Sequence, residues 1–223
     1  FVNVSSAFKT PSLFQLYSDF GNLDLKPEVS QSYEAGFQSI ALKDKLKFGF
    51  TAFARDIKDV IEFALVDPAN FTFQYINVDE QNDYGFEVEL EAVPVKNLTA
   101  KAFYNYVDGK VNKSGNKSYN LFKRPRHNFL FNLGYQATNK LYVGSNFKNV
   151  GKREDLFFNN NTFNTERVKL DSYFTIDFYA EFKAAKQIKL FIDLKNITDE
   201  NFVEVVGFTP RGFNFMSGIS LQL

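Results

Sequence analysis

Apolar and polar residues alternate along most of this chain, and this period of two constrains its fold more than any other feature. Between Ser172 and Lys183, the even positions carry mainly Phe, Ile and Ala, whereas the odd positions carry Tyr, Thr, Asp, Glu and Lys. The same alternation recurs in residues 46–55, 84–92 and 188–195. Because successive side chains of a β-strand point to opposite faces of its sheet, this pattern predicts strands with one apolar and one polar face.

About ten segments show this alternation. Most of them exceed the roughly five to six residues that are usual for a strand in a globular domain, and match or exceed the roughly 9–11 residues of a tilted membrane strand. The sequence therefore predicts long strands in the following ranges: 1–8, 29–43, 46–62, 73–92, 97–110, 125–138, 140–152, 171–184, 187–203 and 212–223.

Short and long connections alternate between these predicted strands. Short turns are expected at 42–45, 94–97, 138–140 and 184–186, and longer polar loops at 9–28, 63–72, 111–124 and 153–170. Outer-membrane barrels show this asymmetry, with tight periplasmic turns and long external loops. The pattern therefore predicts an all-β fold, a transmembrane antiparallel β-barrel whose last strand runs toward the periplasm.

The aromatic content fits such a barrel, because 28 Phe and 11 Tyr are many for one soluble core. The apolar face of each strand would meet lipid, and the polar face would line a wet lumen. Charged residues of neighbouring strands are then expected to pair across the lumen wall, Glu89 with Lys101 and Glu181 with Lys189. No apolar run approaches the roughly 20 residues of a membrane helix.

Several kinds of chemistry are excluded or disfavoured. Equal numbers of basic and acidic residues, 26 of each, give no electrostatic reason to expect nucleic acid as a partner. The lack of cysteine excludes disulfides, thiolate metal sites and a cysteine nucleophile. The single histidine, His127, lies where a predicted loop becomes a strand, which favours a structural or surface role over catalysis. We therefore expect no catalytic residue, no metal site and no cofactor.

Six short stretches, spread over nearly the whole chain, carry a family resemblance. They are FKTPSLFQLY at 8–17, GNLDLKPE at 21–28, SYEAG at 32–36, KRPRH at 123–127, DLKNITDENF at 193–202 and TPRGF at 209–213. In this order they resemble the barrel signature of TonB-dependent outer-membrane receptors, with a lean toward cobalamin and siderophore receptors. Two departures are the Pro-Arg-Gly order in the last stretch and the terminal Leu223, where the family often has an aromatic residue.

The resemblance implies a barrel of roughly 22 strands with a plugged lumen. Residues 1–223 would be the C-terminal portion of the barrel domain, with about ten strands and without the plug. Since the chain begins at Phe1 without a signal peptide, we expect a piece of a longer protein.

The function implied by the resemblance is active import across the bacterial outer membrane. The imported ligand would be scarce, such as cobalamin or a ferric siderophore, and the TonB system of the inner membrane would supply the energy through a region upstream of this chain. The implied partners are outer-membrane lipid, a small nutrient molecule, TonB and, in some members, a surface lipoprotein.

Aromatic and amide side chains of the external loops would contact the ligand. The residues expected there are Tyr17, Phe20, Phe157, Phe158, Asn159 and Asn160. The competing interpretation of each is an ordinary aromatic girdle or polar loop surface.

Two other functions compete with transport. One is a freestanding ten-stranded outer-membrane barrel that acts as an enzyme or adhesin, although a lone histidine at the base of a loop supports a hydrolytic site poorly. The other is a soluble β-sandwich that binds carbohydrate or protein, which does not explain the long strands and the alternating loop lengths.

Overall fold

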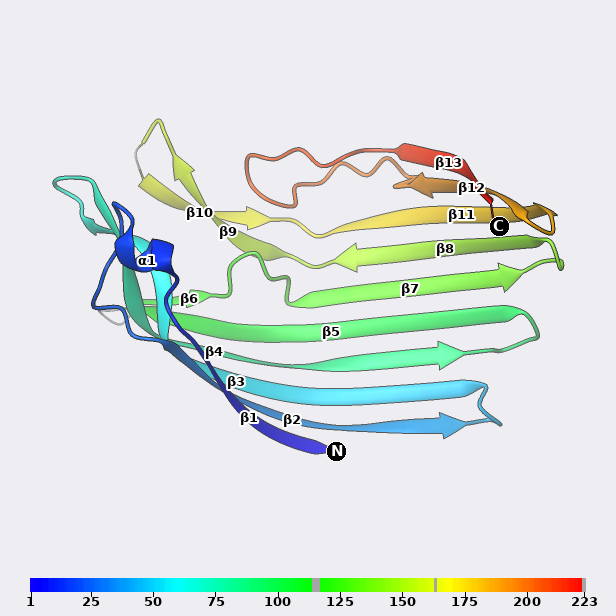
Figure 1. Ribbon diagram of the computed structural model, residues 1–223, viewed down its shortest axis with the longest axis horizontal. Helices are drawn as coiled ribbons and strands as arrows, with labels where there is room; N and C mark the ends of the chain where they lie inside the picture. The colour runs from blue at the N-terminus through cyan, green and yellow to red at the C-terminus, as the bar shows by residue number, and fades with distance from the viewer. Residues whose placement is uncertain (114–116, 163, 222–223) are drawn as a thin grey trace. The chain divides into compact units, whose positions relative to one another are not determined.

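A computed structural model describes residues 1–113, 117–162 and 164–221 (Figure 1). The elements in chain order are β1 (Val2–Lys9), α1 (Leu13–Tyr17), β2 (Glu28–Ala41), β3 (Leu46–Asp67), β4 (Thr72–Ala92), β5 (Leu98–Lys113), β6 (Lys117–Asn120), β7 (His127–Gln136), β8 (Leu141–Val150), β9 (Arg153–Asn159), β10 (Asn164–Leu170), β11 (Tyr173–Ala185), β12 (Ile188–Lys195) and β13 (Asn214–Leu221).

Ten strands are hydrogen-bonded in the order β1-β2-β3-β4-β5-β7-β8-β11-β12-β13, and β6 pairs with β5. β9 and β10 form a separate two-stranded sheet. The strand pairs β1–β2, β5–β7, β7–β8, β8–β11, β11–β12 and β12–β13 are all antiparallel. Consecutive long strands are therefore neighbours in the sheet, which confirms the predicted all-β antiparallel fold.

The chain divides into two compact units, and β2, β3, β4 and β5 each contribute to both. The first unit comprises Phe1–Gly36, Ala52–Gly85 and Asp108–Leu121, and the second comprises Phe37–Thr51, Phe86–Val107 and Phe122–Leu223.

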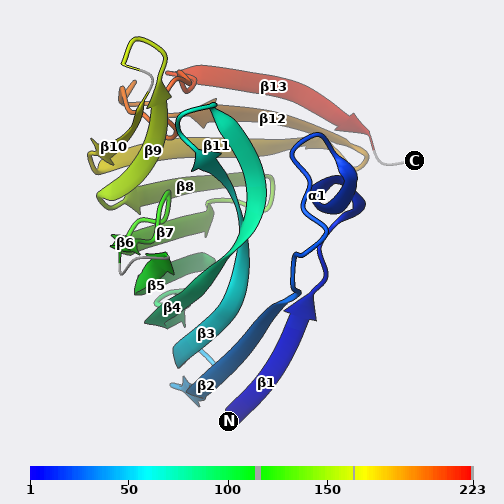
Figure 2. The same ribbon diagram turned by 90° about the vertical axis from the view of Figure 1, so that its left-hand side faces the viewer.

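In the first unit, α1 follows β1 and starts at a capping box (Figure 2). The Ser12 hydroxyl accepts a hydrogen bond from the backbone N–H of Gln15, and the Gln15 side chain accepts one from the backbone N–H of Ser12. Pro11 precedes this cap. These two bonds satisfy N–H groups that the first turn of a helix leaves without a partner. Local capping therefore explains why a helix forms here, although it is only five residues long.

In the second unit, β7, β8, β11, β12 and β13 lie side by side (Figure 1). Phe182 in β11 pairs with Leu190 in β12, which pairs with Ile219 in β13, so their side chains share a face. These three side chains are 44%, 41% and 66% exposed. The predicted alternation is thus present as one sheet face that leaves large apolar side chains uncovered.

Aromatic rings continue this apolar face across the other strands of the second unit. Phe37 of β2, Phe50 of β3, Phe86 of β4 and Tyr104 of β5 form a row with successive ring centroids 6.0, 5.9 and 5.8 Å apart. The Tyr104 hydroxyl lies 2.7 Å from Nδ1 of His127 at the start of β7. The lone histidine is therefore part of an exposed aromatic surface.

Three of the four short turns lie where they were predicted, and the fourth lies at 186–187, because β11 extends to Ala185. The long connections differ more. β3 extends to Asp67 and β4 begins at Thr72, so most of the predicted loop 63–72 is a strand hairpin. The predicted loop 153–170 contains the β9–β10 hairpin, and β6 lies within the predicted loop 111–124. Strand pairing beyond the main sheet explains these differences. Residues 114–116 and 163, and the predicted strand end at 222–223, lie outside the described residues.

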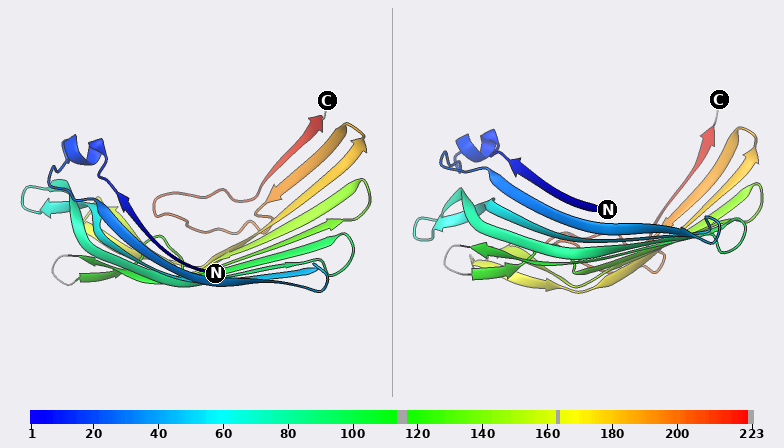
Figure 3. Two further views of the ribbon diagram at one scale, coloured as in Figure 1. Left: turned by 60° about the horizontal axis from the view of Figure 1, so that its bottom comes forward. Right: turned by 90° about the horizontal axis from the view of Figure 1, so that it is seen from below.

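The predicted strand 187–203 is confirmed only in its first half, because β12 covers Ile188–Lys195 and residues 196–213 leave the sheet as a long connection (Figure 3). Asn196 has a φ of 50° and is 5% exposed. Its side chain accepts a hydrogen bond from the backbone N–H of Glu200 and donates one to the Glu200 carbonyl, both at 3.0 Å. These two bonds close a turn over residues 196–200, at the point where the chain leaves the strand.

Candidate functional site

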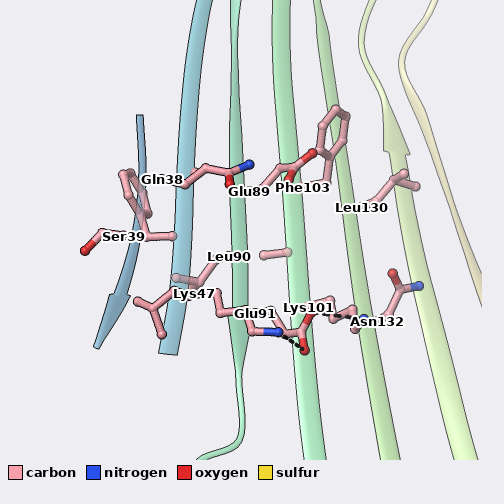
Figure 4. A pocket seen from close by; sticks show the side chains of 14 residues that line it. Gln38, Ser39, Lys47, Glu89, Leu90, Glu91, Lys101, Phe103, Leu130 and Asn132 are labelled. Atoms are coloured by element: carbon pink, nitrogen blue, oxygen red, sulfur yellow. Dashed lines mark ion pairs between the residues drawn. The ribbon is translucent and has the colours of Figure 1, made fainter. Parts of the chain in front are cut away.

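The polar face of the second unit carries two clusters of ion pairs. In the first, Glu91 of β4 contacts Lys101 of β5 at 3.1 Å and Lys47 of β3 at 3.8 Å (Figure 4). Lys101 was expected to pair with Glu89, and that expectation is wrong. Glu89 instead lies beside Gly49, where a Cβ atom would be 3.6 Å from the Glu89 Cβ.

A cavity of about 390 Å³ surrounds the Glu91–Lys101 pair. Gln38, Glu89, Phe103, Leu130 and Asn132 line it together with the charged groups, as Figure 4 shows. The ion-pair side chains are one third to one half exposed, so water screens each pair and leaves it little weight in stability. These charged side chains are therefore better explained as groups that keep this face hydrated than as groups that stabilise the fold.

The second cluster lies on β11 and β12. Glu181 contacts Lys189 at 3.0 Å, which confirms the predicted pair. Lys195 contacts Asp177 at 3.1 Å and Asp193 at 3.2 Å. Carboxylates and amines therefore alternate across the strands of this face.

Amide groups occupy the part of the polar face between these two clusters. Asn132 of β7 donates a hydrogen bond to Asn146 of β8 at 2.6 Å, and Asn128 donates one to Asn105 of β5 at 2.8 Å. A second cavity of about 380 Å³ adjoins Asn132 and Asn146. The polar face thus carries amides of β7 and β8, together with Lys148 of β8, between the two clusters of ion pairs.

The first unit holds a cluster of aromatic side chains at the loop end of β3 and β4. The Phe63 ring centroid lies 5.4 Å from that of Phe20, 5.3 Å from Phe73 and 5.2 Å from Tyr75. Phe14 of α1 adds an edge-on contact with Tyr75 at 6.2 Å. Phe14, Phe20 and Phe63 are exposed, so this aromatic cluster presents apolar ring surface to its surroundings.

Hydrogen bonds fix the 10–27 segment against the aromatic cluster. The backbone N–H of Tyr75 donates to the Phe20 carbonyl at 3.0 Å, and the Asn22 amide donates to the Tyr75 carbonyl at 3.1 Å. Asn77 both accepts from the Lys26 N–H, at 2.8 Å, and donates to the Lys26 carbonyl, at 3.0 Å. The stretch at 21–28 thus has a structural role, since its hydrogen bonds to Tyr75 and Asn77 hold the segment after α1 in place.

The six ligand-contact candidates fall into both units. Tyr17 ends α1 and is exposed, and Phe20 belongs to the aromatic cluster, both in the first unit. Phe157, Phe158, Asn159 and Asn160 lie at the tip of the β9–β10 hairpin in the second unit.

The amide of Asn159 is used within this tip. It donates to Glu166 at 2.7 Å and accepts from the backbone N–H of Asn161 at 2.9 Å. Phe158 and Asn160 are exposed. Ligand contact by any of the six residues stays a prediction.

Sequence reasoning missed a buried group of charged and aromatic residues where β8, β9 and β11 meet the 196–213 connection. Arg153 and Asp155 are only 6% and 1% exposed. The ring of Tyr173 stacks on that of Phe202 with centroids 3.9 Å apart, and its hydroxyl donates to Glu204 at 3.1 Å. Alternation gave no signal for this group, because Arg153 and Asp155 come from a predicted loop while Tyr173 and Phe202 come from two different predicted strands, and no periodicity brings these segments together.

The chain matches the model of the TonB dependent receptor-like β-barrel over residues 1–197. It therefore belongs to this family of outer-membrane receptors. It is 30% identical over 172 residues to the iron-regulated outer membrane virulence protein of Vibrio cholerae serotype O1, an alignment that covers 67% of this chain and 26% of the relative. It is 27% identical over 210 residues to the vitamin B12 transporter BtuB of Photobacterium profundum, covering 90% of this chain and 31% of that protein.

Solved structures of the family share the fold. The pyoverdine outer membrane receptor FpvA of Pseudomonas aeruginosa PAO1 superposes with a TM-score of 0.78 at 18% identity, over 100% of this chain and 33% of FpvA. The chain thus spans about a quarter to a third of the length of these relatives.

Family membership places the protein in the outer membrane as a transmembrane β-barrel. Its relatives are receptors and transporters rather than enzymes. Within the part of the chain that the structure describes, no helix is long and apolar enough to cross a membrane.

Proposed function

We propose that this chain is the C-terminal portion of the barrel of a TonB-dependent transporter, which imports a scarce ligand such as cobalamin or a ferric siderophore. The observation that carries this proposal is the match to the receptor barrel over residues 1–197. One relative is named as iron-regulated and another as a vitamin B12 transporter, and these names support iron complexes and cobalamin as the candidate ligands.

The two faces of the sheet support this role. The exposed Phe, Leu and Ile side chains of the apolar face suit contact with lipid, where a charge would be costly. The opposite face, with its ion pairs and amides, suits a hydrated lumen that holds a plug. In this proposal the plug and the TonB-contacting segment belong to other parts of the protein.

The ligand contacts proposed for this chain are the loop aromatics and amides. An exposed ring on a backbone segment that hydrogen bonds already hold in place loses little conformational freedom when it binds a ligand. Phe20 in the aromatic cluster and Phe158 at the hairpin tip are therefore the preferred candidates for ligand contact.

An uptake experiment on the intact protein tests the proposal. The gene would be deleted in its own host and restored in strains with and without TonB, and each strain would be supplied with radiolabelled cyanocobalamin or with iron-55 complexes of catecholate and pyoverdine siderophores. Uptake of one of these ligands that requires both the gene and TonB is expected. Unchanged uptake of every ligand after deletion of the gene would count against import, and gene-dependent uptake without TonB would count against the energy source.

A further inference from the structure

The β9–β10 hairpin forms a sheet of its own, and one of its faces lies against the 196–213 connection. Arg153, Asp155 and Phe157 alternate along β9, so their side chains share this face. Arg153 and Asp155 hydrogen-bond backbone groups of Val203 and Val206, and the Phe157 ring lies near Gly207. The strand and the connection therefore run alongside each other from the base of the hairpin toward its tip.

Arg153 supplies the main link. Its Nη2 atom donates to the carbonyl groups of Val203, at 2.5 Å, and Glu204, at 3.3 Å, while Nη1 donates to the Asp171 carbonyl at 3.4 Å. Its guanidinium also lies 5.3 Å from the centre of the Tyr173 ring. A guanidinium presents several donors in one rigid plane, so a single side chain can bind two chain segments at once.

Two further contacts extend the link along β9. The Asp155 carboxylate accepts a hydrogen bond from the backbone N–H of Val206 at 3.3 Å and lies 3.8 Å from the Lys123 amine. The Phe157 ring comes within 3.9 Å of the position that a Cβ atom on Gly207 would take. Gly207 has a φ of 87°, a conformation that favours glycine, so the connection passes the ring without a side chain of its own.

The opposite face of the hairpin is different. Leu156 and Phe158 lie on it and are exposed, and Arg167 of β10 pairs there with Glu154. Successive side chains of β9 therefore point alternately toward the 196–213 connection and toward the exposed face.

We propose that Arg153 is a positioning residue that locks the β9–β10 hairpin and the 196–213 connection into one external body and so fixes the orientation of the Phe158 face. The lock follows from the contacts of Arg153 alone. That the Phe158 face meets a ligand rests on the proposed function. A surface held in one orientation before binding loses less entropy when a ligand arrives.

Pulsed electron–electron double resonance on the full-length protein in outer-membrane vesicles tests the lock. Since this stretch has no cysteine, spin labels can be attached at Asn160→Cys on the hairpin tip and Phe208→Cys on the connection, both exposed positions. A single narrow distance distribution is expected. Arg153→Met is expected to widen it at least twofold. Arg153→Lys is expected to widen it as well, because an ammonium group lacks the planar fork of donors. The matched control is Lys152→Met, an exposed neighbouring cation, which is expected to leave the width unchanged.

Heat-modifiable migration in electrophoresis would establish that each variant is a folded barrel. If Arg153→Met does not assemble, Arg153→Gln takes its place, because its shorter amide cannot reach both segments. A broad distribution in the unsubstituted protein, or an unchanged width in the folded Arg153 variant, would overturn the lock. The distance measurement needs no ligand. Failure of the Arg153 lock would appear in the distance distribution, whereas failure of the transport proposal would appear in the uptake experiment.

Discussion

Asp83 of β4 is 3% exposed, and the guanidinium of Arg55 on β3 binds both of its carboxylate oxygens, with Nε at 3.0 Å from Oδ1. A bidentate pair of this kind fixes both the partner and the geometry. Losing one member of a fully buried pair costs about 3–5 kcal/mol, because the other charge stays buried. Arg55 itself is partly exposed, which reduces the expected cost.

Arg55→Met should therefore lower the free energy of unfolding by about 2 kcal/mol. Urea titration of the protein in detergent or lipid vesicles, followed by electrophoretic migration, measures this loss. The matched control is Lys58→Met, an exposed cation of the same strand, which should change stability by less than about 0.5 kcal/mol. Equal losses in the two variants would show that the buried pair is not the cause.

Gly109 in β5 lies unusually close to the neighbouring strand. A Cβ atom at this position would be 2.2 Å from the Asn82 carbonyl oxygen and 2.8 Å from the Asp83 Cα, whereas one at Gly49 would meet nothing closer than 3.6 Å. Gly109→Ala should therefore destabilise the protein by about 1–3 kcal/mol, while Gly49→Ala should be nearly neutral. The same urea titration compares them, and a neutral Gly109→Ala would rule out this close backbone approach.

Residue-level contacts were only partly predictable from the sequence. The Glu181–Lys189 pair spans one short turn, so counting positions from that turn identified it. Counting from the 94–97 turn in the same way selected Glu89 as the partner of Lys101. In the structure, the carboxylate beside Lys101 belongs to Glu91, two positions away on the same face. Alternation determines the face of a side chain, but the exact partner also depends on how each turn offsets the two strands.

At the scale of whole strands, β11 offers the sharpest test of the two faces. Phe178 lies on the apolar face, and Thr175 lies on the polar face of the same strand. Phe178→Lys should impair assembly, since a lysine on the lipid face costs roughly 2–4 kcal/mol near the membrane midplane. Thr175→Lys should be tolerated. Asp177 is a poor control, because it binds Lys195 and the backbone N–H of Asn196.

For Phe178→Lys and Thr175→Lys, the measurement is the fraction of protein recovered as folded barrel in outer membranes, compared with the unsubstituted protein. Equal recovery of Phe178→Lys and Thr175→Lys would contradict the assignment of the lipid face.

The end of β12 depends on a single side chain. Asn196→Ala should destabilise the 196–213 connection by about 1 kcal/mol, because two partly buried backbone groups of Glu200 lose their partner. Asn196→Gly separates the loss of the hydrogen bonds from backbone strain, since glycine adopts the positive φ readily but lacks the side-chain amide. Hydrogen exchange of the Glu200 amide measures the effect. Protection that survives in both variants would show that the turn does not depend on this side chain.

Strands and short turns were predictable because each is set by local pattern and local turn chemistry. The connections were not, for two physical reasons. The β9–β10 hairpin is stabilised by pairing outside the main sheet. Residues 196–203 contain no glycine or proline that would have marked the end of β12, although Asn196 turns the chain away. Neither the capping of α1 nor the Arg153 contacts leave a periodic signal in the sequence.

At the scale of the whole molecule, the chain accounts for about a third of a receptor such as BtuB or FpvA. We therefore expect the native polypeptide that contains residues 8–28 to be far heavier than the 25.7 kDa of this stretch. Intact-mass spectrometry of the protein extracted from outer membranes measures this. A mass near 25.7 kDa would mean a complete small barrel, and an enzyme or adhesin would then replace transport as the proposed function.

The length of β3 has a consequence for what the cell shows to its environment. β3 has 22 residues and β4 has 21, about twice the roughly 9–11 that a tilted strand needs to cross the bilayer. With the 42–45 turn on the periplasmic side, as the transporter proposal places it, about half of this hairpin would project past the lipid headgroups, and Phe71 at its tip is exposed. The residues that would meet a nutrient there would also be open to any large molecule outside the cell.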